Sequence, residues 1–135
     1  MIDERMAHSW AILPPQSIHT FDLSQLDRPG ILFWTVRVDD VLAGCGALKD
    51  EADGSGEIKS MFIRPVWRGQ GLSRKVLETI EAKAREIGLQ RLNLETGTDS
   101  LAARALYESF GYAYCPPFGA YQPDPLSVFM TKNLD

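Results

Sequence analysis

The chain has 135 residues, of which 44% are hydrophobic and 24% charged, and its formal net charge at pH 7 is -4. This length and composition indicate one globular domain spanning residues 1–135, and no apolar run is long enough to cross a membrane. The negative charge argues against a nucleic-acid partner, because such binding depends on clustered lysine and arginine.

The chain contains two cysteines, Cys45 and Cys115, and neither belongs to a C-x-x-C or other metal-ligand spacing. We therefore expect two reduced, partly buried thiols and no metal site. The chain starts without a basic, apolar leader, so we expect a cytoplasmic protein.

The first predicted elements are strands. Ile31–Val38 is rich in β-branched and aromatic residues, and Asp39-Asp40 makes a short turn into Val41–Leu48, which predicts a hairpin. Asp50–Gly56 is a polar loop with the glycines that a turn requires. Glu57–Ile63 follows as a third strand, which Pro65 ends.

The second half alternates helices and strands. From Leu72 the apolar residues recur at helical spacing as far as Gly88, which suits the left-handed end of a helix. The order indicates an α/β fold in which antiparallel strands come first and a βαβ crossover follows. The remaining predicted elements are a strand at Arg91–Thr96, a helix at Ser100–Phe110 closed by Gly111, and strands at Tyr112–Cys115 and Leu126–Leu134.

The start of the first helix has the residues of an anion site. The first amides of a helix have no internal partner and carry partial positive charge, and Gly69, Gly71 and Ser73 leave that backbone accessible. Arg68 and Arg74 add charged groups whose geometry matches phosphate oxygens. The alternative is that the glycines merely permit a tight turn. The ATP-binding and NAD-binding glycine signatures are absent from the sequence.

Two motifs resemble the GNAT superfamily of acyl-CoA-dependent N-acyltransferases. RGQGLS, Arg68–Ser73, resembles its [Q/R]-x-x-G-x-[G/A] signature, with Ser73 in the last position. Leu94–Tyr112 resembles its N-x-x-A-x-x-L-Y-x-x-x-G-F helix, with Ser100 for Asn and Tyr112 for Phe. The resemblance covers nearly all of the chain from Pro14 onward. Within the superfamily it is similar to a small bacterial branch, the YsnE-like proteins.

This resemblance implies a GNAT-type fold, a mixed and mostly antiparallel sheet with helices on both faces, and acetyl-CoA as co-substrate. The turn and the first helix would hold the diphosphate of coenzyme A, and its pantetheine arm would lie along the third strand. The implied cofactor-binding residues are Met61, Phe62, Ile63, Arg68, Gly69, Gln70, Gly71, Leu72, Ser73, Arg74 and Ser100.

The implied activity is transfer of the acetyl group to a primary amine of a small molecule, amino acid or peptide. An alkyl ammonium costs roughly 4.6 kcal/mol to deprotonate at pH 7, so a base is needed. Glu57 resembles the family's base position, although it could be a solvated strand end, and Glu95 is a second candidate. Tyr107 occupies the position of the family's general acid, or it packs its ring in the core.

The acceptor site is expected between Ile12–Leu26 and Pro116–Pro125, with His19, Phe118 and Tyr121 as candidate contacts. A lone loop histidine is, however, more often structural. Direct attack in a ternary complex is favoured over an acyl-enzyme at Cys115. The alternatives to an enzyme are a non-catalytic acyl-CoA sensor and a phosphate-binding protein of unrelated chemistry.

The family's first strand and first helix have too little room before Ile12, so the first strand is expected to be missing. Either the given start lies downstream of the true one, or Ile31–Val38 is left as an uncovered sheet edge. A second subunit could cover this edge, which suggests a homodimer.

Overall fold

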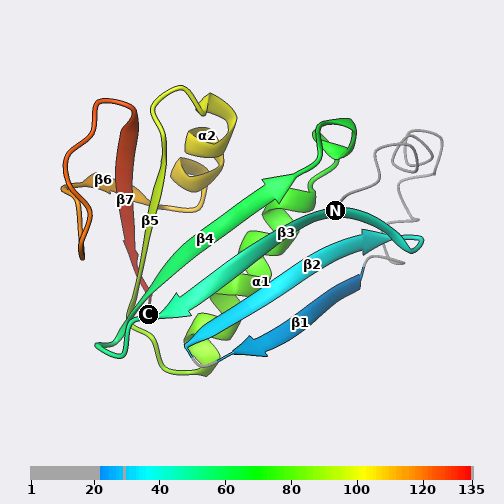
Figure 1. Cartoon of the computed structure of the whole chain (residues 1–135), viewed down its shortest axis with the longest axis horizontal. Coiled ribbons are helices and arrows are strands. Elements are labelled where there is room, and N and C mark those ends of the chain that lie inside the picture. Colours follow the sequence, from blue (N-terminus) through cyan, green and yellow to red (C-terminus); the bar gives the residue numbers. More distant parts are fainter. Residues whose placement is uncertain (1–21, 29, 135) are drawn as a thin grey trace.

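The computed structural model describes residues 22–28 and 30–134. Their strands form one seven-stranded sheet in the order β1-β2-β3-β4-β5-β7-β6 (Figure 1). The elements are β1 (Asp22–Arg28), β2 (Ile31–Val38), β3 (Val41–Asp50), β4 (Ser55–Ile63), the short 3-10 helix η3 (Pro65–Trp67), α1 (Leu72–Glu86), β5 (Arg91–Gly97), α2 (Leu101–Ser109), β6 (Ala113–Cys115) and β7 (Ser127–Asn133). The predicted mixed, mostly antiparallel α/β architecture is confirmed.

The strand β2 is not an edge of the sheet, so that prediction was wrong. β1 pairs with it antiparallel, from Asp22 opposite Arg37 to Arg28 opposite Ile31. The sequence of β1, DLSQLDR, does not alternate between apolar and polar residues, and its pattern therefore gave no strand signal. Residues 22–26, predicted to be part of a loop beside the acceptor, belong to this strand.

Because β1 covers β2, that strand offers no edge for a second subunit to pair with, and the homodimer stays a prediction. The part of the chain in which the missing family strand was considered lies outside the described residues. No helix in residues 22–28 and 30–134 has both the length and the apolar character needed to cross a membrane.

The antiparallel hairpin of β2 and β3 is confirmed. Asp39 and Asp40 have φ values of 51° and 67°, the left-handed conformation that a tight two-residue hairpin turn requires. In β4, Ser60 has a φ of 58°, and the register with β3 shifts opposite it, between Cys45 and Ala47. Such an irregularity inserts an extra residue and changes which side chains face the same way.

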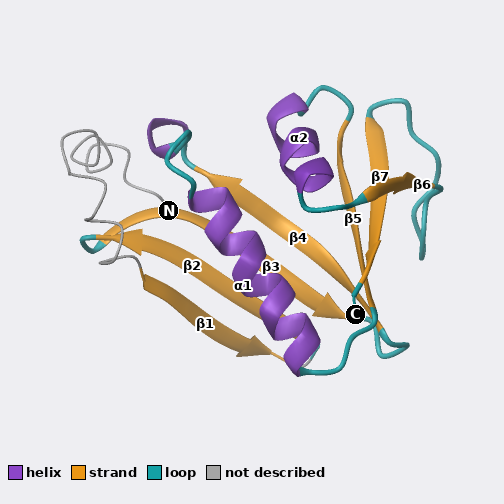
Figure 2. Ribbon diagram, turned by 180° about the vertical axis from the view of Figure 1, so that it is seen from behind, coloured by secondary structure: helices purple, strands orange, loops and turns teal. Residues whose placement is uncertain are grey.

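The sheet opens between β4 and β5. These strands pair in parallel only over Ser55–Ile58 and Arg91–Leu94, and beyond this they diverge, as Figure 1 and Figure 2 show. β5 instead continues along β7, which also carries the short edge strand β6. The opening therefore lies beside the second half of β4, from which the chain continues through η3 into α1.

Both described helices contribute to one hydrophobic core. α1 crosses the face of the sheet formed by β2, β3 and β4, as Figure 2 shows. It buries its apolar stripe there, and α2 adds Tyr107 to the same cluster. The stripe consists of Leu72, Val76, Leu77, Ile80 and Ala84.

On the opposite face of the sheet, aromatic side chains from a loop pack against β7. Ile58 belongs to the core, so its neighbour Glu57 on β4 points to the other face, and Phe129 does the same beside Met130 on β7. There Phe118 and Tyr121, from the loop between β6 and β7, pack on Phe129. This loop therefore packs on the second face of the sheet beside β7.

Candidate active site

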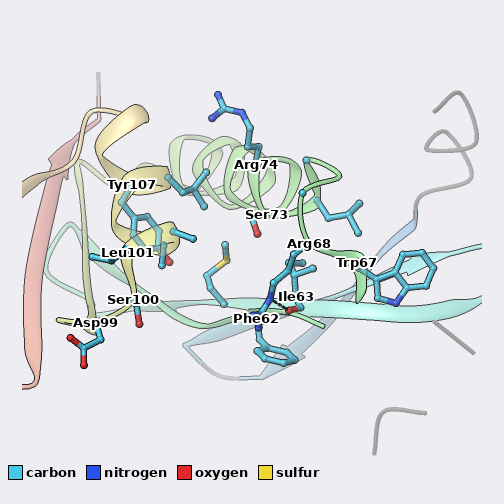
Figure 3. A pocket seen from close by; sticks show the side chains of 17 residues that line it. Phe62, Ile63, Trp67, Arg68, Ser73, Arg74, Asp99, Ser100, Leu101 and Tyr107 are labelled. Carbon is cyan, nitrogen blue, oxygen red and sulfur yellow. Dashed lines mark hydrogen bonds between the residues drawn. The ribbon is translucent and has the colours of Figure 1, made fainter. Parts of the chain in front are cut away.

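A cavity of about 820 Å³ lies between the end of β4, the start of α1 and the first turns of α2 (Figure 3). Its position coincides with the opening between β4 and β5. Three separate stretches of the sequence therefore form one site. The lining residues are Met61, Phe62, Ile63, Trp67, Arg68, Gly69, Gly71, Leu72, Ser73, Arg74, Asp99, Ser100, Leu101, Ala102, Ala103, Leu106 and Tyr107.

The turn into α1 requires two of its glycines. Gly69 and Gly71 have φ values of 81° and 83°, a backbone conformation that other residues adopt only with strain. Among the described residues, a Cβ atom at either position would have no neighbour within 4 Å, so the space beside the backbone is open to them. Gly71 caps α1, and no side chain from residues 22–28 or 30–134 caps its first turn. The open space and the free amides fit a phosphate group.

The two arginines of the turn are held by different contacts. Arg68 donates from Nε to the carbonyl of Ile63, 2.8 Å away, and its guanidinium lies 5.5 Å from the centre of the Phe62 ring. Arg74 lies over the ring of Phe110 at 4.8 Å, and in Figure 3 its side chain points away from the cavity. Both supply positive charge at the rim, but Arg68 is the one fixed beside β4.

Tyr107 enters the cavity from the last turns of α2 (Figure 3). Its side chain is buried, and this burial raises the pKa of its hydroxyl to about 12. The hydroxyl has no hydrogen-bond partner within the described part of the chain. The ring packs edge-on against Tyr112, with centroids 5.7 Å apart. The Tyr107 ring is therefore held by packing, and its hydroxyl keeps its proton at neutral pH.

Tyr112 is in turn fixed by a buried ion pair. Its hydroxyl donates to Glu81 of α1 over 2.7 Å, and the same carboxylate contacts the ammonium of Lys132 on β7 at 2.9 Å. Arg85 approaches it to 3.7 Å. One carboxylate thus connects α1, β7 and the segment that follows α2, and the wall that carries Tyr107 is held in place.

Glu57 lies on the opposite face of the sheet and does not line the cavity. It is buried, and its Oε2 accepts a hydrogen bond of 2.6 Å from the hydroxyl of Tyr121. Glu95, on β5, accepts a hydrogen bond from the hydroxyl of Ser127. The sheet therefore separates the two candidate catalytic groups, Tyr107 and Glu57, at the point where β4 and β5 diverge.

The cavity gathers every predicted cofactor-binding residue except Gln70, and it includes Tyr107. Phe118 and Tyr121 meet near Glu57 on the other face, whereas His19 lies outside the described residues. Beyond the predicted residues, the cavity is lined by Trp67, Asp99, Leu101, Ala102, Ala103 and Leu106. Ala103 lies one helical turn before Tyr107, so the helical period applied backward from Tyr107 would have found it. Asp99 precedes α2, and the places of Leu101, Ala102 and Leu106 do not follow from that period.

Residues 22–28 and 30–134 contain no group of three or more His, Cys, Asp or Glu side chains arranged to hold a metal ion. Cys45 and Cys115 are both free thiols, and burial raises the pKa of each.

Comparison with known proteins decides the family. Residues 3–112 match the sequence profile described as the Acetyltransferase (GNAT) family. The chain belongs to the GNAT acetyltransferase family. Solved structures that share the fold at 18% identity include an N-acetyltransferase of Thermoplasma acidophilum in complex with coenzyme A and a GNAT family acetyltransferase of Elizabethkingia anophelis with acetyl-CoA bound.

Individual GNAT relatives match over nearly the full length. The chain is 45% identical to the uncharacterized N-acetyltransferase YsnE of Bacillus subtilis, over 99% of this chain and 90% of that protein. It is 42% identical to an IAA acetyltransferase of Azospirillum brasilense, over 99% of this chain and 88% of that protein. A Klebsiella pneumoniae structure, provisionally described as an acyl-CoA N-acyltransferase, superposes with a TM-score of 0.77 at 41% identity, covering 96% and 88% of the two chains. The predicted GNAT-type fold and YsnE-like resemblance are confirmed.

Proposed function

We propose that this protein is an acetyl-CoA-dependent N-acetyltransferase that acetylates a primary amine by direct attack in a ternary complex. The observation that carries the proposal is the cavity itself. At its mouth, α1 starts without a side-chain cap after Gly69 and Gly71, which have left-handed backbone. In its wall, the hydroxyl of Tyr107 keeps its proton and has no hydrogen-bond partner among the described residues. These groups suit a ligand with phosphates at one end and a reacting carbonyl at the other.

The residues divide into a phosphate end and a pantetheine end. The amides that follow Gly69 and Gly71, with Arg68 at the rim, would hold the diphosphate of coenzyme A. Met61 and Ile63 line the cavity from the part of β4 that has no partner strand on its β5 side, which leaves room there for the amide-rich pantetheine arm. When bound, acetyl-CoA supplies the acetyl group as an activated thioester.

In the chemical step the acceptor nitrogen loses two protons and the sulfur gains one. Glu57 takes the first proton from the ammonium of the acceptor, which leaves a neutral amine able to attack the acetyl carbon. Tyr107 gives its hydroxyl proton to the sulfur as the carbon–nitrogen bond forms and the carbon–sulfur bond breaks, and the second proton of the nitrogen returns to the tyrosinate, which restores Tyr107. Because Glu57 and Tyr107 face opposite sides of the sheet, we infer that the acceptor enters from the Glu57 face through the opening between β4 and β5.

The decisive experiment measures thiol release from acetyl-CoA by the wild type and by Tyr107→Phe, with pools of amino acids, polyamines, other small amines and peptides as acceptors. We expect release that depends on one pool, and a fall in kcat of roughly 100-fold in the variant with unchanged affinity for coenzyme A. Tyr114→Phe is the matched control, because it removes a hydroxyl that contacts Glu108 away from the cavity. Coenzyme A binding without release from any pool would instead favour the sensor.

A further inference from the structure

The bond between Tyr121 and Glu57 joins two distant parts of the chain on the face opposite the cavity. The tyrosine lies in the loop between β6 and β7, and the glutamate lies near the start of β4. Their oxygen atoms are 2.6 Å apart, the short distance of a hydrogen bond to a carboxylate. Glu57 is only 5% exposed, so the direction of its carboxylate is set by its protein contacts.

The Tyr121 ring is fixed independently of this bond. It packs against Phe118 from its own loop, with centroids 5.2 Å apart, and against Phe129 of β7 at 5.4 Å. Phe118 and Phe129 also meet, at 5.7 Å, so the three rings form a closed aromatic cluster. Such a cluster restricts the ring without using the hydroxyl. The packed ring therefore holds the Tyr121 hydroxyl beside Glu57.

The bond occupies only one of the two carboxylate oxygens. Tyr121 donates to Oε2, and the ammonium of Lys59 lies 3.8 Å from the same oxygen. Oε1 accepts no hydrogen bond within the described part of the chain. A carboxylate held at one oxygen and open at the other can take a proton from an amine or from a bridging water without first losing a bond.

We propose that Tyr121 is a positioning residue, which holds Glu57 through Oε2 so that Oε1 acts as the base; this rests on the proposed function. The role differs from that of a direct acceptor contact, the role for which Tyr121 was first considered. A positioning residue acts only through Glu57, whereas an acceptor contact would contribute whether or not Glu57 is present. The two roles therefore predict different behaviour when both side chains are changed.

The first test is a double-mutant cycle in the full chain with Tyr121→Phe and Glu57→Gln. Tyr121→Phe keeps the aromatic cluster and removes only the hydroxyl. We expect kcat to fall roughly 100-fold in Glu57→Gln and roughly 10-fold in Tyr121→Phe, with KM for acetyl-CoA unchanged. The double variant should be no slower than Glu57→Gln alone. Tyr114→Phe again serves as the control and should match the wild type.

Several outcomes would overturn the assignment, each differently. Losses that multiply in the double variant, or a Tyr121→Phe defect confined to KM of the acceptor, would make Tyr121 an acceptor contact. A Glu57→Gln variant as fast as the wild type would remove the base, and with it the positioning role, while acetyl transfer itself stood.

A second readout needs no turnover. The hydrogen bond to Glu57 is the main cause that raises the pKa of Tyr121 to about 12, and burial and the charges of Glu57, Glu95 and Glu51 raise it as well. Lys59 is the nearby cation. NMR of labelled tyrosine rings should show Tyr121 protonated from pH 9 to 11 in the wild type. In Glu57→Gln, the same ring should titrate at lower pH. Identical titration in both proteins would overturn the coupling on which the proposal depends.

Discussion

The two faces of the sheet at the β4–β5 opening are built in different ways. On one face, the cavity is lined by consecutive residues of two helix starts and one strand end, and its backbone amides and glycines are as important as its side chains. On the other face, residues from separate elements meet through side-chain hydrogen bonds, Tyr121 with Glu57 and Ser127 with Glu95. A site made of local backbone leaves a motif in the sequence, whereas a site made of tertiary contacts leaves isolated residues.

The largest expected effect is a loss of affinity for coenzyme A, caused by a change on the cavity face alone. Gly71→Asp places a carboxylate where we propose that the diphosphate binds, and at about 4 Å such repulsion amounts to roughly 4 kcal/mol at an intermediate dielectric, or on the order of 1,000-fold in affinity. Isothermal titration with coenzyme A measures this loss. Gly71→Asn has the same shape without the charge and should lose far less. Gly88→Asp, another left-handed glycine with open space, controls for strain. Retained affinity in Gly71→Asp would move the phosphate site elsewhere.

The next effect concerns the stability of the wall behind Tyr107. Glu81→Ala removes the buried partner of both Lys132 and Tyr112, which should cost about 3 kcal/mol of unfolding free energy. Urea denaturation measures this cost. Glu78→Ala, an exposed change on the same helix, should cost less than about 0.5 kcal/mol. Equal costs for the two variants would show that the Glu81 contacts do not hold the two elements together.

A smaller effect is a dependence of the free energy of unfolding on pH, caused by Tyr107 on the cavity face. The pKa of Tyr107 is raised from 10 to about 12, so folding favours the protonated hydroxyl. The resulting stability is fully present below pH 10 and is lost as the pH rises from 10 towards 12. Urea denaturation at pH 9, 10 and 11 should therefore show a steeper alkaline loss for the wild type than for Tyr107→Phe. Parallel curves would mean that the Tyr107 hydroxyl is hydrated in the folded state.

The smallest effect is the difference in coenzyme A affinity between a change at Arg74, in the first turn of α1, and a change at Arg68, in the turn before it. Arg74 packs over Phe110 and points away from the cavity, so Arg74→Ala should weaken coenzyme A binding by only about 3-fold, an effect that salt should reduce further. Arg68→Ala should weaken it more, because Arg68 is fixed beside β4. Titrations at low and high salt measure both. A larger loss in Arg74→Ala would show that its side chain turns toward the ligand.

The sequence could predict the strands and helices whose patterns are periodic. The hairpin of β2 and β3, the amphipathic α1 and the glycine turn before it all follow from local rules, because each is stabilised largely by residues close together in the chain. β1 was missed because its residues show no alternation, and only its pairing with β2 makes it a strand. The irregularity of β4 at Ser60 was also missed, because a serine in a sequence does not predict a positive φ.

For the site, the sequence by itself predicted the open turn at Gly69 and Gly71, because helix geometry fixes neighbours within a few residues, and the resemblance placed Tyr107 in the second motif. Only the tertiary structure decided that Tyr107 and Glu57 lie on opposite faces of the sheet. It alone also brought Tyr121 to Glu57 across 64 positions of the chain. The physical reason is that strand pairing and side-chain packing set distances between remote segments, and no local pattern records which segments will meet.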